Sequence, residues 1–316
     1  MPVTRKPKPK PCIVALGRMG GQTGLRVVRT IRYAEEAPLD VVGDRSWLRS
    51  IAIGPLDGVH GVLLHPQDHD GNLIPCADHE IVVMCVGKGQ RASKVSTNAG
   101  HALYALAWLR TLGIPVLVLQ AAVPPDGWQQ GDPAGVVAAI VEACGKLDDV
   151  EKAVSIVPVP RKVHGQGFSM GAGIMDRAAA QLPSWLTLGS LVRCSAGGPW
   201  SRGEVQYNYK CPIVTVVTGR DTTIPTQQQR YGVANLRRAG NGVNVVEVQG
   251  GGHAMWPSAL LDVFTALHLR RVGPSPLLVQ NCLFPPYLRT STASSASKLA
   301  AADAEVTVKT SMAVKG

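Results

Sequence analysis

The sequence has little of several features that mark specialised classes of protein. Only 17% of its 316 residues are charged and 45% are hydrophobic, which excludes intrinsic disorder of the whole chain. No apolar run approaches the roughly 18 to 20 residues that a membrane-spanning helix needs. The 34 glycines and 23 prolines follow no strict period, which excludes a collagen-like fibre. These absences leave a globular chain with a large core.

The seven cysteines are odd in number, scattered and never spaced as a C-x-x-C pair. Neither a disulfide framework nor a zinc site is therefore expected. We predict no metal, no cofactor and an intracellular, reducing compartment, either cytoplasmic or organellar. One group of histidines and aspartates does not have the spacing of metal ligands on a common helix or strand. We therefore expect them to be solvated turn residues: His65, Asp68, His69, Asp70, Asp78 and His79.

Acidic side chains are missing from residues 1–34, which hold eight Lys or Arg, whereas residues 35–286 hold twenty basic and twenty acidic side chains. A neutral body with a basic arm argues against specific nucleic-acid binding and is consistent with an arm that touches an anionic membrane surface. Apolar side chains at Leu25, Val28 and Ile31 have helical spacing, so an organelle transit peptide and a plain basic extension both stay open. We expect no secretory signal.

Residues 35–286 alternate short apolar runs with helical patterns, which is typical of a mainly parallel sheet with helices on both faces. This α/β body is followed by residues 287–316, a flexible tail rich in Ser, Thr and Ala. A leading antiparallel hairpin is expected at residues 51–53 and 61–65. Later strands are expected at residues 81–86, 114–119, 188–194, 212–217 and 243–248, and helices at residues 99–112, 136–147, 171–181, 226–239 and 258–270.

A G-x-S-x-G pentapeptide at residues 167–171 places Ser169 between glycines. A turn that holds a serine in strained backbone between a strand and a helix needs such small neighbours. Asp221 and His253 each follow a late expected strand, and the carboxyl ends of parallel strands meet at one edge of the sheet. We therefore expect the three side chains to meet, with His253 taking the Ser169 proton and Asp221 orienting the imidazole.

On these residues, about 48–271 of the chain resembles an α/β-hydrolase. Within that family it is similar to the compact serine hydrolases that include monoacylglycerol lipases, acyl-protein thioesterases and related peptidases. The resemblance implies the α/β-hydrolase fold and a serine hydrolase that cleaves carboxylic esters or thioesters through an acyl-enzyme intermediate. The short link at 195–211 leaves no room for a large helical cap, so we expect little or no cap domain. The matching pieces, in the family's order, are residues 57–61, 167–173, 219–225 and 252–253.

Two stretches depart from the family's pattern. Residues 86–90 read Val-Gly-Lys-Gly-Gln where relatives usually carry a His-Gly pair; the glycines still suit the backbone role, so the resemblance assigns the oxyanion amides to Lys88 and Met170. Residues 161–166 are polar, whereas the strand that enters an elbow is normally apolar. Either residues 154–159 form the buried strand, or the elbow is distorted.

Aromatic side chains near the expected site, Trp200 and Trp256, are candidates for the wall of an acyl pocket. The alternative to an enzyme is a catalytically degenerate scaffold or interaction protein with the same fold. A less favoured alternative is a dinucleotide-dependent oxidoreductase, because the glycines of residues 17–24 are spaced G-x-x-G-G-x-x-G and do not match G-x-G-x-x-G.

Overall fold

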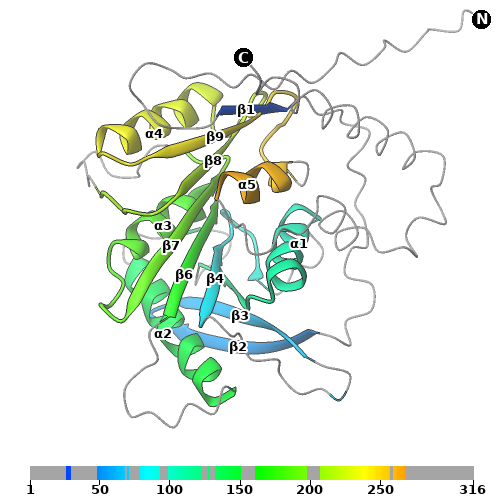
Figure 1. Cartoon of the computed structure of the whole chain (residues 1–316), viewed down its shortest axis with the longest axis vertical. Coiled ribbons are helices and arrows are strands. Elements are labelled where there is room, and N and C mark those ends of the chain that lie inside the picture. The colour runs from blue at the N-terminus through cyan, green and yellow to red at the C-terminus, as the bar shows by residue number, and fades with distance from the viewer. Residues whose placement is uncertain are drawn as a thin grey trace, which may run out of the picture.

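The computed structural model describes the greater part of the body and a short piece of the basic arm (Figure 1). The tail, most of the arm and the glycines of residues 17–24 lie outside the described residues, as does Trp200. The described residues are 26–29, 48–67, 70, 79–92, 99–121, 127–128, 132–150, 161–197, 207–256 and 259–267.

A nine-stranded sheet runs through the protein in the order β1-β9-β8-β7-β6-β4-β5-β3-β2. The predicted hairpin is present as β2 and β3, and β3 also pairs antiparallel with β5, whereas every other pairing is parallel. The predicted mainly parallel sheet is therefore confirmed. The strands are β1 (Arg26–Arg29), β2 (Leu48–Leu56), β3 (Val59–Pro66), β4 (Glu80–Cys85), β5 (Val116–Gln120), β6 (Arg161–Phe168), β7 (Leu186–Cys194), β8 (Ile213–Thr218) and β9 (Val243–Val248).

Helices cover both faces of the sheet, as predicted (Figure 1). One core lies between the sheet and α1, η2 and α5, and a second core lies between the sheet and α2, α3 and α4. Central parallel strands are buried on both faces, which is why all six residues of β4 and of β8 are buried and most of them are apolar. The helices are α1 (Ala99–Leu106), the π-helical η2 (Ala107–Thr111), α2 (Asp132–Val150), α3 (Met170–Ala179), α4 (Thr226–Arg238) and α5 (Leu260–Ala266).

The basic arm contributes a strand where its sequence suggested a helix. Arg26–Arg29 pairs in parallel with β9, with Arg26 opposite Val245 and Arg29 opposite Val248. Of Leu25, Val28 and Ile31, whose spacing suggested a helix, only Val28 lies in this four-residue strand, and β9 offers the backbone groups of its outer side for pairing. The sheet therefore extends into the residues predicted to form a separate arm.

The polar strand β6 itself enters the elbow as a buried strand, and residues 154–159, the alternative position for that strand, lie outside the described residues. Its residues are buried except Lys162, and its charged side chains are paired with acids from other elements. The Arg161 guanidinium binds the Asp148 carboxylate on α2, and Lys162 Nζ lies 3.0 Å from Glu80 Oε1 on β4. Buried charges persist where a partner compensates their lost hydration, which explains this unusual strand.

The other polar side chains of β6 face the opposite side of the sheet from α3. The Trp108 indole N–H donates to Gln166 Oε1 at 2.9 Å, and His164 Nδ1 lies 2.8 Å from the Ser190 hydroxyl oxygen on β7. The partners come from distant parts of the chain, so the local sequence of β6 could not reveal them. None of the described helices is both long and apolar enough to cross a lipid bilayer.

Candidate active site

Ser169 occupies a strained turn between β6 and α3, with φ 54° and ψ −122°. A positive φ is costly for a residue with a Cβ and persists only where the surroundings hold it. The Ser169 amide donates to the Cys194 carbonyl at 3.0 Å, and the Ala172 amide donates to the Ser169 carbonyl at 3.2 Å. The turn is therefore tied both to β7 and to the helix that it starts.

The two glycines around Ser169 are required by close approach of the backbone. A Cβ on Gly167 would lie 2.3 Å from the Cα of Ala172 in α3. A Cβ on Gly171 would lie 2.3 Å from the Cys85 carbonyl oxygen at the end of β4. Both distances are far below van der Waals contact, so the G-x-S-x-G pattern follows from the packing of α3 on β6 and β4.

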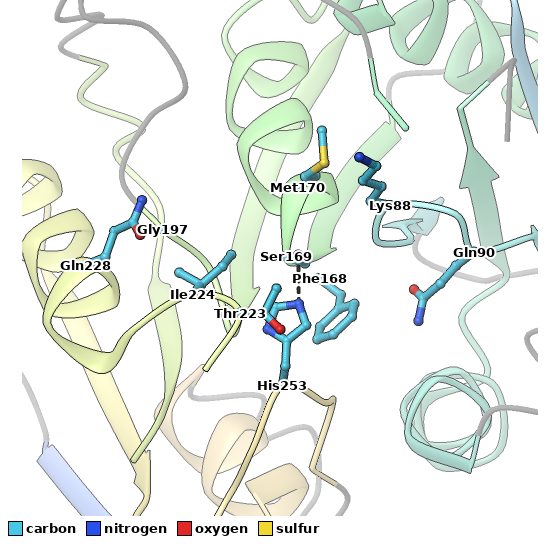
Figure 2. A pocket seen from close by; sticks show the side chains of 10 residues that line it. All are labelled: Lys88, Gln90, Phe168, Ser169, Met170, Gly197, Thr223, Ile224, Gln228 and His253. Atoms are coloured by element: carbon cyan, nitrogen blue, oxygen red, sulfur yellow. Dashed lines mark hydrogen bonds between the residues drawn. The ribbon is translucent and has the colours of Figure 1, made fainter. Parts of the chain in front are cut away.

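The structure brings together the three side chains predicted to form a triad. His253 Nε2 lies 3.0 Å from Ser169 Oγ (Figure 2), and His253 Nδ1 lies 2.8 Å from Asp221 Oδ2. In a neutral imidazole with its proton on Nδ1, that N–H donates to the carboxylate and leaves Nε2 to accept the serine hydroxyl proton. The arrangement is chemically able to deprotonate Ser169.

The Asp221 carboxylate is held by four donors, which the sequence analysis did not identify. Its Oδ1 accepts the amides of Thr223 at 2.9 Å and Ile224 at 2.8 Å. Its Oδ2 accepts the Thr218 hydroxyl and the Gln229 side-chain amide, each at 3.0 Å. An aspartate at the start of a turn commonly accepts hydrogen bonds from the next backbone amides, so the sequence could have indicated the Thr223 and Ile224 donors. Nothing in the local sequence marked Gln229, which reaches Asp221 from α4.

The strand order and the position of these residues decide the fold. An antiparallel hairpin leads the sheet, the serine follows β6, the acid follows β8 and the histidine follows β9. The order Ser, Asp, His on an elbow after a central parallel strand is that of one architecture. The chain has the α/β-hydrolase fold. This confirms the predicted fold class, and no described residue forms a cap domain over the serine.

Several solved structures are similar to the chain. They include an α/β serine hydrolase homologue from Coxiella burnetii (15% identity over 74% of this chain and 96% of that one, TM-score 0.48) and a carboxylesterase from Mesorhizobium loti (14%, 69% and 98%, TM-score 0.46). Another is a Xanthomonas campestris member of the α/β serine hydrolases without lid (16%, 72% and 96%, TM-score 0.45). No protein-family model matches the chain, and no curated protein does. At these identities the likeness concerns the fold alone.

The two residues predicted to supply oxyanion amides, Lys88 and Met170, both line the pocket in front of Ser169 (Figure 2). Met170 is the first residue of α3, directly after the serine, and Lys88 lies in the loop after β4. Neither backbone amide has an acceptor within the described part of the chain. Both are therefore available to a substrate oxygen.

The loop that carries Lys88 is held by side chains that the sequence analysis missed. The Gly87 amide donates to Gln90 Oε1 at 2.7 Å, and the Gln90 amide donates back to the Gly87 carbonyl at 3.2 Å. The Trp128 indole N–H donates to the Val86 carbonyl at 2.6 Å. The loop after β4 is therefore fixed at its start and across its turn.

The pocket has a volume of about 630 Å³ and is open to solvent on one side. Phe168 forms part of its lining, and its ring centroid lies 5.0 Å from that of His253 and 5.3 Å from that of His101. Burial lowers the pKa of His101 to about 4, so this second imidazole is neutral at pH 7. The other lining residues include Gln90, Gly197, Thr223, Ile224 and Gln228.

Two further sequence predictions need correction. Trp256 does not line the pocket; it is 5% exposed in the core beneath α1 and α5, with its indole N–H donating to the Gly252 carbonyl at 3.1 Å. His65 is not a solvated turn residue, because it is fully buried in β3 with Nδ1 2.8 Å from the Pro66 carbonyl oxygen. Among the described residues, no group of three or more His, Cys, Asp and Glu side chains is placed to hold a metal ion.

Proposed function

We propose that the protein is a serine hydrolase that cleaves carboxylic esters or thioesters through an acyl-enzyme intermediate. The observation that carries this proposal is the continuous hydrogen-bonded series of Ser169, His253 and Asp221, at 3.0 and 2.8 Å, on a strained elbow. A serine hydroxyl is a weak nucleophile without an adjacent base, and this series supplies one. The four donors around Asp221 support the proposal further, because they keep the acid aligned with His253.

In the proposed reaction, Ser169 Oγ attacks the carbonyl carbon while His253 Nε2 accepts the hydroxyl proton. The carbonyl oxygen becomes an oxyanion and accepts hydrogen bonds from the amides of Lys88 and Met170. His253 then gives its proton to the leaving alcohol or thiol as the carbon–oxygen or carbon–sulfur bond breaks. Water, deprotonated by His253, hydrolyses the acyl-serine and returns Ser169 to its starting state.

The form of the pocket supports esters and thioesters as substrates. Phe168, Met170 and Ile224 supply apolar surface for an acyl chain, and the opening to solvent leaves space for a leaving group.

Labelling with a fluorophosphonate probe tests the proposal. We expect the native protein to be labelled, and Ser169→Ala and His253→Ala to be unlabelled while keeping the native circular-dichroism spectrum. Hydrolysis of 4-nitrophenyl esters and of acyl thioesters by the native protein is the second readout. A folded native protein that neither labels nor hydrolyses would instead support the catalytically degenerate scaffold.

A further inference from the structure

The described lining of the pocket in front of Ser169 contains one lysine and no acid. The lysine is Lys88, and none of the lining residues that the structure describes is Asp or Glu. Asp221 lies behind His253, is only 6% exposed, and has both oxygens occupied by donors. An anionic group that enters the pocket is therefore attracted by Lys88, and no carboxylate of the described lining repels it.

Lys88 also has no carboxylate partner within the described part of the chain. It differs in this from other cationic side chains near the sheet: Lys162 pairs with Glu80, and Arg193 pairs with Asp176. A cation that already has a partner gives up that interaction when it binds a ligand, and Lys88 does not.

Lys88 is exposed, and the start of its side chain lies beside the Gly127 backbone. A Cβ on Gly127 would lie 2.9 Å from Lys88 Cγ and 3.4 Å from Met170 Cε, so the lysine stem lies close against the Gly127 backbone. Figure 2 shows the side chains of Lys88 and Met170 next to each other on one side of Ser169. The Lys88 side chain thus lines the pocket while its charged end stays hydrated.

On the opposite side of the pocket, the described lining side chains carry no charge. Thr223, Ile224 and Gln228 come from the segment after β8 and the start of α4, and Figure 2 shows them across Ser169 from Lys88. The two sides therefore differ in what they attract: a negative charge on the Lys88 side, and neutral or apolar groups on the Ile224 side.

We propose that the protein prefers esters or thioesters that carry a carboxylate, which Lys88 binds. This inference rests on the proposed hydrolase function and adds the class of substrate. The carboxylate belongs either to the acyl chain or to the leaving group, and two pairs of substrates distinguish these cases.

The first pair is 4-nitrophenyl hydrogen glutarate and 4-nitrophenyl pentanoate, which have acyl chains of equal length with and without a charge. The second pair is 4-carboxyphenyl butyrate and its methyl ester, which differ in the charge of the leaving group. The readout is the ratio of kcat/KM for the charged substrate to kcat/KM for the neutral one. The Lys88 amide serves both members of a pair equally, so effects of a substitution on the oxyanion site cancel in this ratio.

We expect the native protein to favour the charged member of one pair by about fivefold, the value of a partly exposed ion pair of about 1 kcal/mol. Lys88→Gln should abolish the preference, Lys88→Glu should reverse it, and 0.5 M salt should weaken it. Arg91→Gln is the matched control, because Arg91 is an exposed cation close in sequence that does not line the pocket. It should keep the native ratio.

Equal ratios in native protein and Lys88→Gln would overturn the inference, as would equal losses in Lys88→Gln and Arg91→Gln. If the neutral esters are cleaved without any preference in either pair, the substrate class is wrong and the hydrolase function stands. If no ester is cleaved and the fluorophosphonate probe does not label Ser169, the hydrolase function fails and the substrate class fails with it.

Discussion

Gln229 Nε2 lies 3.0 Å from Asp221 Oδ2, so a side chain of helix α4 holds the acid that orients His253. The same side chain accepts the Thr218 amide at 3.0 Å through its Oε1. Gln229 is fully buried and joins the end of β8 to the acid. The alignment of the triad therefore depends on a residue that touches neither Ser169 nor His253.

Replacing Gln229 by leucine should impair both stability and ester hydrolysis. The Thr218 amide and one Asp221 oxygen would each lose a buried partner, which costs about 1 to 3 kcal/mol per group. We expect the free energy of unfolding in urea to fall by about 2 kcal/mol and kcat/KM to fall about tenfold. Gln227→Leu, an exposed substitution two residues earlier, is the control and should change neither. Equal behaviour of the two variants would contradict the role of Gln229.

Gly171→Ala should disrupt the elbow, because its Cβ would lie 2.3 Å from the Cys85 carbonyl oxygen and 2.4 Å from that of Val86. We expect a loss of several kcal/mol in the free energy of unfolding, typical of overpacking against backbone, and loss of fluorophosphonate labelling. Gly145→Ala on α2 is the matched control: nothing lies within 4 Å of its added Cβ, and alanine is favoured in a helix by about 1 kcal/mol. Thermal unfolding of both variants checks this, and labelling of Gly171→Ala at the native rate would refute the packing argument.

Gln90 should act as a positioning residue for the Lys88 amide. Gln90→Met removes the acceptor of the Gly87 amide and keeps the length of the side chain, so kcat for a neutral ester should fall about tenfold with little change in KM. Gln90→Glu retains an acceptor oxygen and should keep most of the native kcat. Steady-state kinetics on both variants test this, and the interpretation is wrong if methionine and glutamate reduce kcat equally.

Glu80 should make stability depend on acid pH. Burial alone would raise the pKa of Glu80, but its interactions with His164 and Lys162 outweigh burial and hold the pKa below the usual 4.5. A lowered carboxyl pKa stabilises the native state above the usual pKa, and this contribution is lost as the pH falls through the folded-state pKa. Native protein should therefore be more stable than Glu80→Gln at pH 7, and the difference should shrink below pH 4.5. Urea unfolding from pH 7 to pH 3 measures the difference in the free energy of unfolding between the two proteins. A difference that does not change with pH would contradict a stabilising role of the ionised Glu80 carboxylate.

Much of the fold was predictable because several of its parallel strands are mostly apolar. The runs now seen as β4, β5, β8 and β9 alternate with helices of clear periodicity, and Asp221 and His253 follow two of the strands. Their common position at the sheet edge is a property of parallel strands and needs no knowledge of side-chain packing. Asp221 and His253 could be named on that ground, and Ser169 from its G-x-S-x-G pentapeptide.

Other features depend on contacts between distant residues and were out of reach. Gln166 is buried in a strand because Trp108, 58 residues away in sequence, donates to it. The sequence around Gln229 and Gln90 does not indicate the hydrogen bonds that their side chains make. Trp256 was placed at the pocket from its nearness to His253 in sequence, but its ring turns into the core instead.

The polar strand β6 also prevents slippage of the sheet. If a purely apolar strand shifted by two residues relative to its neighbours, it would still bury the same face. Only the detailed fit of its side chains would then disfavour the shifted register. In β6, such a displacement in one direction would bring Val163 to the place of Gly165, where an added Cβ would lie only 2.9 Å from Leu191 Cδ1 and 3.0 Å from Met175 Cγ. It would also move Arg161 into the buried apolar place of Val163 and away from Asp148. The observed alignment of β6 satisfies both its charges and its glycines, and it places Ser169 at the edge of the sheet.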